Sequence, residues 1–192
     1  MIGVIDLGIG NTGSVLNSLR NLGFDCGKIE NREDFRAANK IIFPGVGSFG
    51  SALKKLEETG IMDELLREIN SGKEFLGICL GMQLLFEDSE ESPGSAGFSV
   101  LRGKVKKFKS GKVPQIGWNY VKSSEKILPE GYYYFANSFY CTPAESKDIV
   151  AMTEYRVEFA SAVRRKNIFA VQFHPEKSGK LGIEFLRRWC EC

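Results

Sequence analysis

The sequence predicts a single α/β domain, an open and mainly parallel sheet flanked by helices with additional antiparallel strands. Two observations predict it. Short apolar runs alternate with helical patterns in the first half of the 192 residues, and the stretch from Ser99 to Gln172 is rich in Val, Ile, Phe and Tyr. Strand–helix alternation favours a parallel sheet with helices on both faces, and turn-separated β-branched runs favour antiparallel strands. We expect one domain over residues 1–192, because a chain of this length can bury a full core.

The first half of the chain is expected to alternate strands and helices. Apolar residues run together at strand-like length, and between these runs apolar side chains recur at helical spacing, as Val15, Leu16 and Leu19 do. Pro44 and Gly45 break the run before them and mark its end. The expected strands are Ile2–Leu7, Lys40–Phe43 and Phe75–Cys79, and the expected helices are Thr12–Leu22, Phe49–Glu57, Met62–Asn70 and Leu80–Glu87.

The second half of the chain has a different residue pattern. Turn signals such as Ser110-Gly111 and Lys166-Asn167 separate its β-branched and aromatic runs, which predicts antiparallel or mixed strands. A last helix is expected over Gly179–Cys190, where leucine, phenylalanine and tryptophan recur at helical spacing.

Composition and charge narrow the class of protein. The chain is 43% apolar and 26% charged, which is ordinary for a globular protein, and a formal net charge of +2 does not suggest a nucleic-acid partner. No apolar run is long enough to cross a membrane, and the N-terminal MIGVIDLG predicts a first strand rather than a signal peptide. An odd number of cysteines favours free thiols in a reducing cytoplasm, and their spacing predicts no metal site. They are Cys26, Cys79, Cys141, Cys190 and Cys192.

Cys79 stands at an expected strand-to-helix turn, in the stretch FLGICLGMQLLF over residues 75–86. The form Gly-x-Cys-x-Gly is the thiol counterpart of the nucleophile elbow, in which a sharp turn presents a side chain at the carboxyl end of the sheet. Gly77 and Gly81 have no side chain to collide where the turn folds back. The start of a helix favours the thiolate, and the free N–H of Leu80 can face a developing oxyanion. A buried core cysteine is the alternative that the elbow alone leaves open.

The chain has one histidine, His174, in the stretch VQFHPEKS. Pro175 disfavours helix at His174, and in an extended segment residues two apart lie on the same face. Glu176 is therefore expected beside the imidazole, where it can fix the tautomer as the third group of a catalytic triad does. A surface histidine beside a turn proline is the alternative. Together, Cys79, His174 and Glu176 predict a nucleophile, its base and an orienting carboxylate.

Four motifs, in this order, resemble those of the class I glutamine amidotransferases. They are PGVGSFG (44–50), GICLGMQLLFEDSEE (77–91), PQIGWN (114–119) and QFHPEKS (172–178). The similarity is greatest to the glutaminase subunits of imidazole glycerol phosphate synthase, and it covers essentially the whole chain. It implies the amidotransferase fold and a reaction in which Cys79 attacks the side-chain amide of glutamine, ammonia leaves and water hydrolyses the glutamyl thioester. His174 would move the protons and Glu176 would orient it.

The resemblance also implies residues that surround the reacting amide. Val46 in the PGVG loop and Leu80 would supply the N–H groups of an oxyanion hole. The glutamine-binding positions would be Gly47, Gln83, Glu91, Ser138 and Phe139. The chemistry is consistent, because a zwitterion needs a carboxylate for its ammonium group, here Glu91, and N–H donors for its own carboxylate. Without the resemblance, Gln83 and Glu91 would be taken as solvated residues.

Members of this family deliver ammonia to a second protein. The resemblance implies a heterodimer with a (β/α)8-barrel cyclase subunit, which uses the ammonia to form imidazole glycerol phosphate in histidine biosynthesis. The positions that match the interface or the ammonia path are Asn11, Trp118, Asn119 and Lys177. Core packing is the alternative role for Trp118. The implied substrate is L-glutamine, and no cofactor, metal, nucleic acid or membrane is implied.

Two departures from the family pattern leave the ammonia acceptor open. The family commonly has histidine at the positions of Gln115 and Asn137. Neither position belongs to the expected triad, so glutamine hydrolysis stays the prediction. A paralogous glutaminase, whose barrel partner amidates a surface-polysaccharide sugar, is the alternative for the acceptor. A cysteine peptidase on the same elbow and a non-catalytic flavodoxin-like module are the alternatives for the class of protein.

Overall fold

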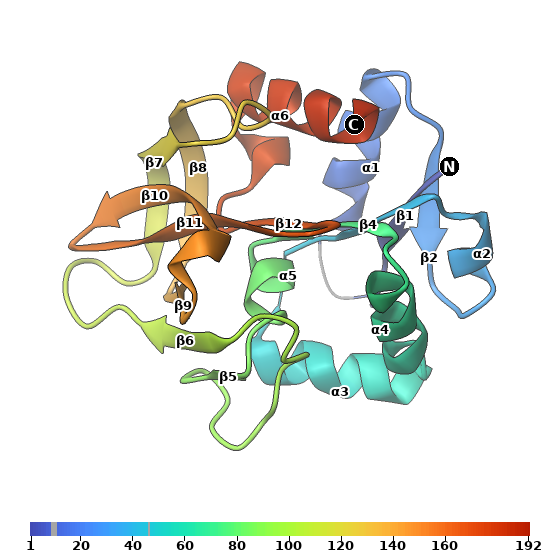
Figure 1. Cartoon of the computed structure of the whole chain (residues 1–192), viewed down its shortest axis with the longest axis horizontal. Coiled ribbons are helices and arrows are strands. Elements are labelled where there is room, and N and C mark those ends of the chain that lie inside the picture. Colours follow the sequence, from blue (N-terminus) through green and yellow to red (C-terminus); the bar gives the residue numbers. More distant parts are fainter. Residues whose placement is uncertain (9–10, 46) are drawn as a thin grey trace.

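The computed structural model describes residues 1–8, 11–45 and 47–192. Figure 1 shows a twisted sheet with helices on both faces. One face carries α1 (Thr12–Asn21) and α6 (Gly179–Glu191), and the other carries α3 (Phe49–Thr59), α4 (Met62–Asn70) and α5 (Leu80–Gln83). The remaining helical segments are the short α2 (Asp34–Ala37) and the 3₁₀ turns η1 (Ser146–Asp148) and η2 (Pro175–Lys177). Within the described residues, none of the helices combines the length and apolar character that crossing a bilayer requires.

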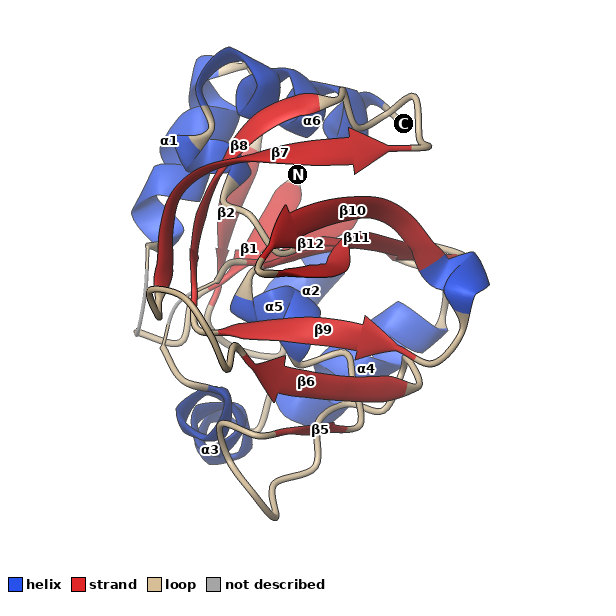
Figure 2. Ribbon diagram, turned by 90° about the vertical axis from the view of Figure 1, so that its left-hand side faces the viewer, coloured by secondary structure: helices blue, strands red, loops and turns tan. Residues whose placement is uncertain are grey.

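The sheet has a parallel half and an antiparallel half. The parallel half runs in the order β2 (Cys26–Ile29), β1 (Ile2–Ile5), β3 (Lys40–Phe43), β4 (Glu74–Ile78) and β12 (Ile168–Val171). The antiparallel half continues through β11 (Val157–Arg165), β10 (Ile149–Tyr155), β7 (Gln115–Ser123) and β8 (Gly131–Asn137). Off this path, β9 (Phe139–Pro143) pairs with β11 and with β6 (Gly103–Lys107), and β6 also pairs with β5 (Asp88–Ser89). In Figure 2 the β7–β8 pair curls away from the rest of the sheet toward α6.

The parallel strands bury side chains on both faces, which explains their nearly continuous apolar sequences. In β3, Ile41 and Phe43 belong to the core beneath α3 and α4, whereas Ile42 between them belongs to the core beneath α1 and α6. Because helices cover both faces, the strand ends are where this half of the sheet can present reactive side chains.

Most of the expected elements are confirmed, and one helix is shorter than predicted. β3 and α4 have the predicted bounds, and the stretch from Ser99 to Gln172 is built mainly of antiparallel strands. The helix expected over Leu80–Glu87 ends at Gln83, so that prediction is wrong at its C-terminal half. The carbonyls of the following residues accept hydrogen bonds from a distant segment instead, as Leu84 does from the N–H of Phe98 at 2.7 Å. β2 and α2 were not predicted.

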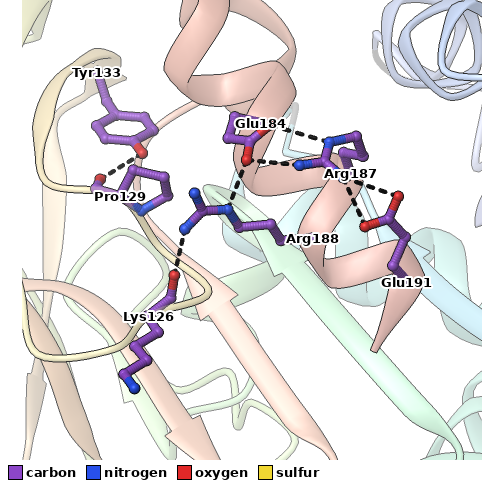
Figure 3. A network of polar contacts seen from close by, with 7 residues as sticks. All are labelled: Lys126, Pro129, Tyr133, Glu184, Arg187, Arg188 and Glu191. Carbon is purple, nitrogen blue, oxygen red and sulfur yellow. Dashed lines mark hydrogen bonds and ion pairs between the residues drawn. The ribbon is translucent and has the colours of Figure 1, made fainter.

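The C-terminal part of α6 holds the loop between β7 and β8 (Figure 3). Arg188 donates from Nη1 to the carbonyl of Lys126 at 2.5 Å and from Nε to the Glu184 carboxylate at 2.8 Å. Tyr133 on β8 donates its hydroxyl to the carbonyl of Pro129 in the same loop at 2.7 Å. Burial raises the pKa of Tyr133, so this hydroxyl stays a donor. These contacts fix the position of the β7–β8 pair.

Candidate active site

Adjacent parallel strands end at one edge of the sheet and bring the candidate catalytic residues together. β12 pairs with β4 in a register that sets Val171 beside Ile78. Cys79 follows Ile78, and its N–H donates to the carbonyl of Val171 at 2.7 Å. The segment from Gln172 to Glu176 follows Val171, and the loop after Phe43 ends the neighbouring β3. The sheet thus places the loop, the cysteine and the histidine segment side by side.

Cys79 forms the expected elbow between β4 and α5. Its backbone has φ 51° and ψ −100°, a conformation that residues other than glycine rarely adopt. A Cβ atom on Gly77 would lie 2.6 Å from the carbonyl oxygen of Gly81, and one on Gly81 would lie 2.4 Å from that of Phe43. A side chain at either glycine would therefore collide with backbone, as the sequence predicts. Cys79 is largely buried, yet it lines a pocket rather than sitting only in the core.

His174 and Glu176 lie together beneath this edge. The Nδ1 atom of His174 is 2.9 Å from Oε1 of Glu176, and the two side chains are 5% and 2% exposed. The backbone also holds the histidine, because its N–H donates to the carbonyl of Tyr134 at 2.8 Å and its carbonyl accepts from the hydroxyl of Ser178 at 2.6 Å. The alternative of a surface histidine is wrong, because His174 is buried.

The pKa of His174 is raised from 6.5 to about 10. Burial is the largest single influence and lowers the pKa, because an apolar surrounding disfavours the charged ring. The charge and hydrogen bond of the Cys79 sulfur raise the pKa, and those of Glu176 raise it further, so that together they outweigh the burial. Near neutral pH the ring is therefore an imidazolium that can give a proton to a leaving group.

Cys79 and His174 open onto a pocket of about 300 Å³. All five positions that the resemblance assigns to glutamine binding line this pocket, together with the cysteine, the histidine and Leu80. Its lining residues are Gly45, Gly47, Cys79, Leu80, Gln83, Glu91, Pro114, Ala136, Asn137, Ser138, Phe139, His174 and Lys177. A concave site with a few convergent polar groups is what a small zwitterionic substrate needs.

Gln83 and Glu91 are held by backbone groups at the pocket wall. The Nε2 atom of Gln83 donates to the carbonyl of Phe139 at 3.2 Å, and this glutamine is 5% exposed, so a solvated role for it is wrong. The Oε2 atom of Glu91 accepts from the N–H of Phe49 at 2.7 Å, at the start of α3. A helix start favours a carboxylate, so the N–H of Phe49 holds the Glu91 side chain at the wall of the pocket.

The structure describes one of the two expected oxyanion donors. Leu80 is the first residue of α5, so its N–H has no acceptor within the helix, and Leu80 lines the pocket. Val46, the other candidate, lies outside the described residues.

The expected interface residues do not all meet at the pocket. Lys177 lines it, and Asn11 precedes α1, a helix that contacts η2. Trp118 lies on the outer face of β7 and is 55% exposed, so the alternative of core packing is wrong. Asn119, its neighbour on the strand, lines a separate groove between β7 and β10.

Gln172 is a site residue that was not predicted from the sequence. Its side chain is fully buried, and its Nε2 atom donates to the sulfur of Cys79 at 3.5 Å. The available signal was its spacing, because Gln172 stands two residues before His174 in an extended segment and shares its face.

Known proteins share both the sequence pattern and the fold. The chain matches the family model described as Glutamine amidotransferase class-I over residues 3–190. It is 44% identical to "Imidazole glycerol phosphate synthase subunit HisH" of Methanothermobacter thermautotrophicus, over 100% of this chain and 98% of that protein. It is 45% identical to the protein of the same name from Pyrococcus furiosus, over 98% of this chain and 97% of that protein.

A solved structure described as "Crystal structure of glutamine amidotransferase" has the same fold. The TM-score is 0.82 at 19% identity, and the match covers 100% of this chain and 98% of that one. The chain therefore belongs to the class-I glutamine amidotransferases, in the group of glutaminase subunits of imidazole glycerol phosphate synthase.

Proposed function

We propose that Cys79, His174 and Glu176 are the catalytic triad with which this glutaminase subunit hydrolyses glutamine. The observation that carries the proposal is their convergence at one sheet edge. The thiol and the imidazole line one pocket, and the carboxylate lies 2.9 Å behind the ring, on the nitrogen Nδ1. The arrangement has the order of a nucleophile, a proton carrier and an orienting group.

The reaction follows from these positions. The Cys79 thiolate attacks the side-chain carbonyl carbon of glutamine, a C–S bond forms, and the carbonyl electrons move to oxygen near the N–H of Leu80. His174 gives its proton to the leaving nitrogen, so ammonia departs and a glutamyl thioester remains. The neutral ring then takes a proton from water, whose oxygen attacks the thioester, and glutamate leaves as the thiolate re-forms.

The pocket wall would hold the amino-acid end of glutamine. Glu91 is the carboxylate for the substrate ammonium, and its fixed position at the start of α3 supports this role. Backbone N–H groups of Ser138 and Phe139 would hold the substrate carboxylate, and Gln83 and Gly47 would complete the wall. Charge-assisted hydrogen bonds at both charged groups would leave the side-chain amide directed toward Cys79.

The outer face of β7 and β8 would dock the partner subunit. Ile116, Trp118, Tyr120 and Tyr132 are exposed there, and the rings of Tyr120 and Tyr132 pack edge to face at 5.4 Å. An uncovered aromatic strip of this kind is typical of protein interfaces. It adjoins the pocket, because Ala136 belongs to β8 and also lines the pocket.

The identity of the partner subunit is also part of the proposal. The related HisH proteins are named as subunits of a synthase, which supports a second subunit that receives ammonia. We take this subunit to be a (β/α)8-barrel cyclase that forms imidazole glycerol phosphate, in a cytoplasm that keeps the five cysteines free. Asn11, Trp118, Asn119 and Lys177 would lie at or near the interface.

A glutamine analogue with a diazoketone in place of the amide tests the triad. We expect it to alkylate Cys79, identified by peptide mass spectrometry, and glutamine to protect this residue. The exposed Cys192 offers a matched control, because Cys192→Ser should be labelled at Cys79 as fast as the unmodified protein. Equal labelling of all exposed thiols, with no protection by glutamine, would contradict the proposal.

A further inference from the structure

We propose that Gln172 is a positioning residue for the nucleophile: its side-chain amide donates to the sulfur of Cys79 and connects that sulfur to the wall of the glutamine pocket. This inference rests on the proposed role of Cys79.

The sheet register brings the two residues together. Gln172 follows the last residue of β12 and Cys79 follows the last residue of β4, and Val171 and Ile78 are partners in the ladder. The N–H of Gln172 donates to the carbonyl of Ser161 at 2.9 Å, so its backbone stays attached to β11. Gln172 is therefore held beside the elbow from both neighbouring strands, and its side chain shares the face of His174.

A chain of hydrogen bonds fixes which end of the Gln172 amide faces the sulfur. The carbonyl of Phe139 can only accept, so the contact at 3.2 Å must come from Nε2 of Gln83. The same Nε2 atom lies 3.2 Å from Oε1 of Gln172, which must then accept. The remaining end of Gln172, the donor Nε2, lies 3.5 Å from the sulfur of Cys79. An amide flip at Gln172 would break two contacts.

The direction of the donor suits a thiolate rather than a thiol. A thiolate accepts hydrogen bonds strongly, whereas a neutral thiol accepts them weakly. Gln172 is fully buried, so its N–H is shielded from competing water. The sulfur then has the imidazolium of His174 and the amide of Gln172 as its stabilising neighbours, and Gln172 directs the lone pairs that attack the substrate.

The chain offers a matched control in Gln115. It is also a buried glutamine, at 2% exposure, but neither Nε2 nor Oε1 has a hydrogen-bond partner among the described residues. Replacing Gln172 by methionine removes the hydrogen-bond donor that faces the Cys79 sulfur. The same replacement at Gln115 removes an amide that has no hydrogen-bond partner among the described residues. The two variants have the same change in chemistry and a similar change in shape.

The test is the rate at which iodoacetamide alkylates Cys79 in the substrate-free protein, followed by mass spectrometry of the Cys79 peptide. Near neutral pH we expect Gln172→Met to react about tenfold more slowly than the unmodified protein, the scale of a lost hydrogen bond to a charged group. At alkaline pH, where the thiolate forms without help, the rates should converge. Gln115→Met should react at the unmodified rate.

Equal alkylation of Gln172→Met and the unmodified protein near neutral pH, with the fold intact by circular dichroism, would overturn the inference. If Gln172→Met does not fold, Gln172→Glu carries the test, because it keeps the shape and replaces the donor by an oxygen. It should be slower still. A failure of the inference is distinguishable from a failure of the triad: in the first case glutamine still protects Cys79 of the unmodified protein, and in the second it does not.

Discussion

The Nδ1 atom of His174 lies 2.9 Å from Oε1 of Glu176, while the other carboxylate oxygen, Oε2, is buried with no hydrogen-bond partner among the described residues. The contact requires a proton on Nδ1, so the other ring nitrogen is the one free to serve Cys79. A buried carboxylate with one unpaired oxygen is costly, which indicates that Glu176 is kept for the histidine rather than for stability.

The first prediction concerns the protonation of the ring. Because the pKa of His174 is raised to about 10, the ring should keep its proton well above the ordinary value of 6.5. His174 is the only histidine in the sequence, so no other imidazole signal can be confused with it in an NMR titration. We expect one imidazole titration on the alkaline side, and the alkaline limb of glutaminase activity to follow it as the proton is lost.

A control for this titration is Cys79→Ser. The substitution removes the thiolate charge and leaves the burial, which lowers the pKa, so the imidazole should titrate at lower pH than in the unmodified protein. An imidazole that titrates at the same pH in both proteins would show that no thiolate faces His174.

The second prediction ranks the losses in kcat that follow from replacing His174 and Glu176. His174→Asn should lose about 10²-fold or more in kcat, the scale of general acid–base catalysis. Glu176→Gln should cost less, because Glu176 orients the ring and stabilises its charge without transferring a proton, and the alkaline limb should move to lower pH. Steady-state glutamate release with the partner present measures both. Equal losses in the two variants would show that the role of Glu176 is wrong.

The third prediction separates the chemistry of Cys79 from its backbone strain. Cys79→Ala and Cys79→Gly should both abolish glutamine hydrolysis and keep the fold. Glycine usually makes a regular element less stable than alanine by about 0.5–1 kcal/mol. At φ 51° and ψ −100° the order should reverse, because only glycine adopts this conformation without strain. Urea unfolding compares the two variants, and alanine as the more stable of them would contradict a strained elbow.

Elements with clear local patterns were predictable, and those that depend on distant segments were not. Lys40–Phe43 and Met62–Asn70 could be bounded from sequence because their apolar spacing coincides with the buried residues. The end of α5 could not, since it depends on hydrogen bonds from residues near Phe98. β2 at the sheet edge buries only Ile29 fully, so its sequence lacks an apolar run.

In the candidate site, too, residues in local patterns were predictable and contacts between distant segments were not. Cys79, His174 and Glu176 stand in local patterns, an elbow and a period of two, that indicate their chemistry. The contact of Gln172 with Cys79 joins residues 93 positions apart through the register of two strands, and no local pattern reveals such a register. The exposure of Trp118 was likewise open, because alternation along β7 does not say which face is covered.

The fourth prediction concerns docking. Trp118→Ala should weaken the complex with the partner subunit at least tenfold, because large aromatic side chains at the centre of interfaces commonly cost about 1.4 kcal/mol or more when truncated. Activity of the isolated chain should not change, since Trp118 does not line the pocket. Calorimetric titration with the partner measures the affinity. Val157→Ala is the control, because Val157 is also exposed but lies on β11.

The last prediction is that the partner controls the glutaminase. Free ammonia wastes glutamine, so we expect low activity for the isolated chain and a large increase when the partner carries its acceptor. β8 offers a physical route, because the carbonyl of Tyr134 accepts from the N–H of His174 and the N–H of Tyr134 donates to the hydroxyl of Ser178 at 2.9 Å. A partner on the outer face of β8 is thus one strand from the base.

The oxyanion hole could amplify such a change. One N–H donor of an oxyanion hole is worth about 10²–10³ in kcat, so a docking event that brings one donor into position would produce an increase of that size. The measurement is glutaminase kcat/KM for the chain alone, with the barrel cyclase, and with the cyclase bound to its acceptor. Equal values in all three would exclude coupling. Activation only by a different barrel protein, loaded with a sugar, would show that the ammonia goes to another acceptor.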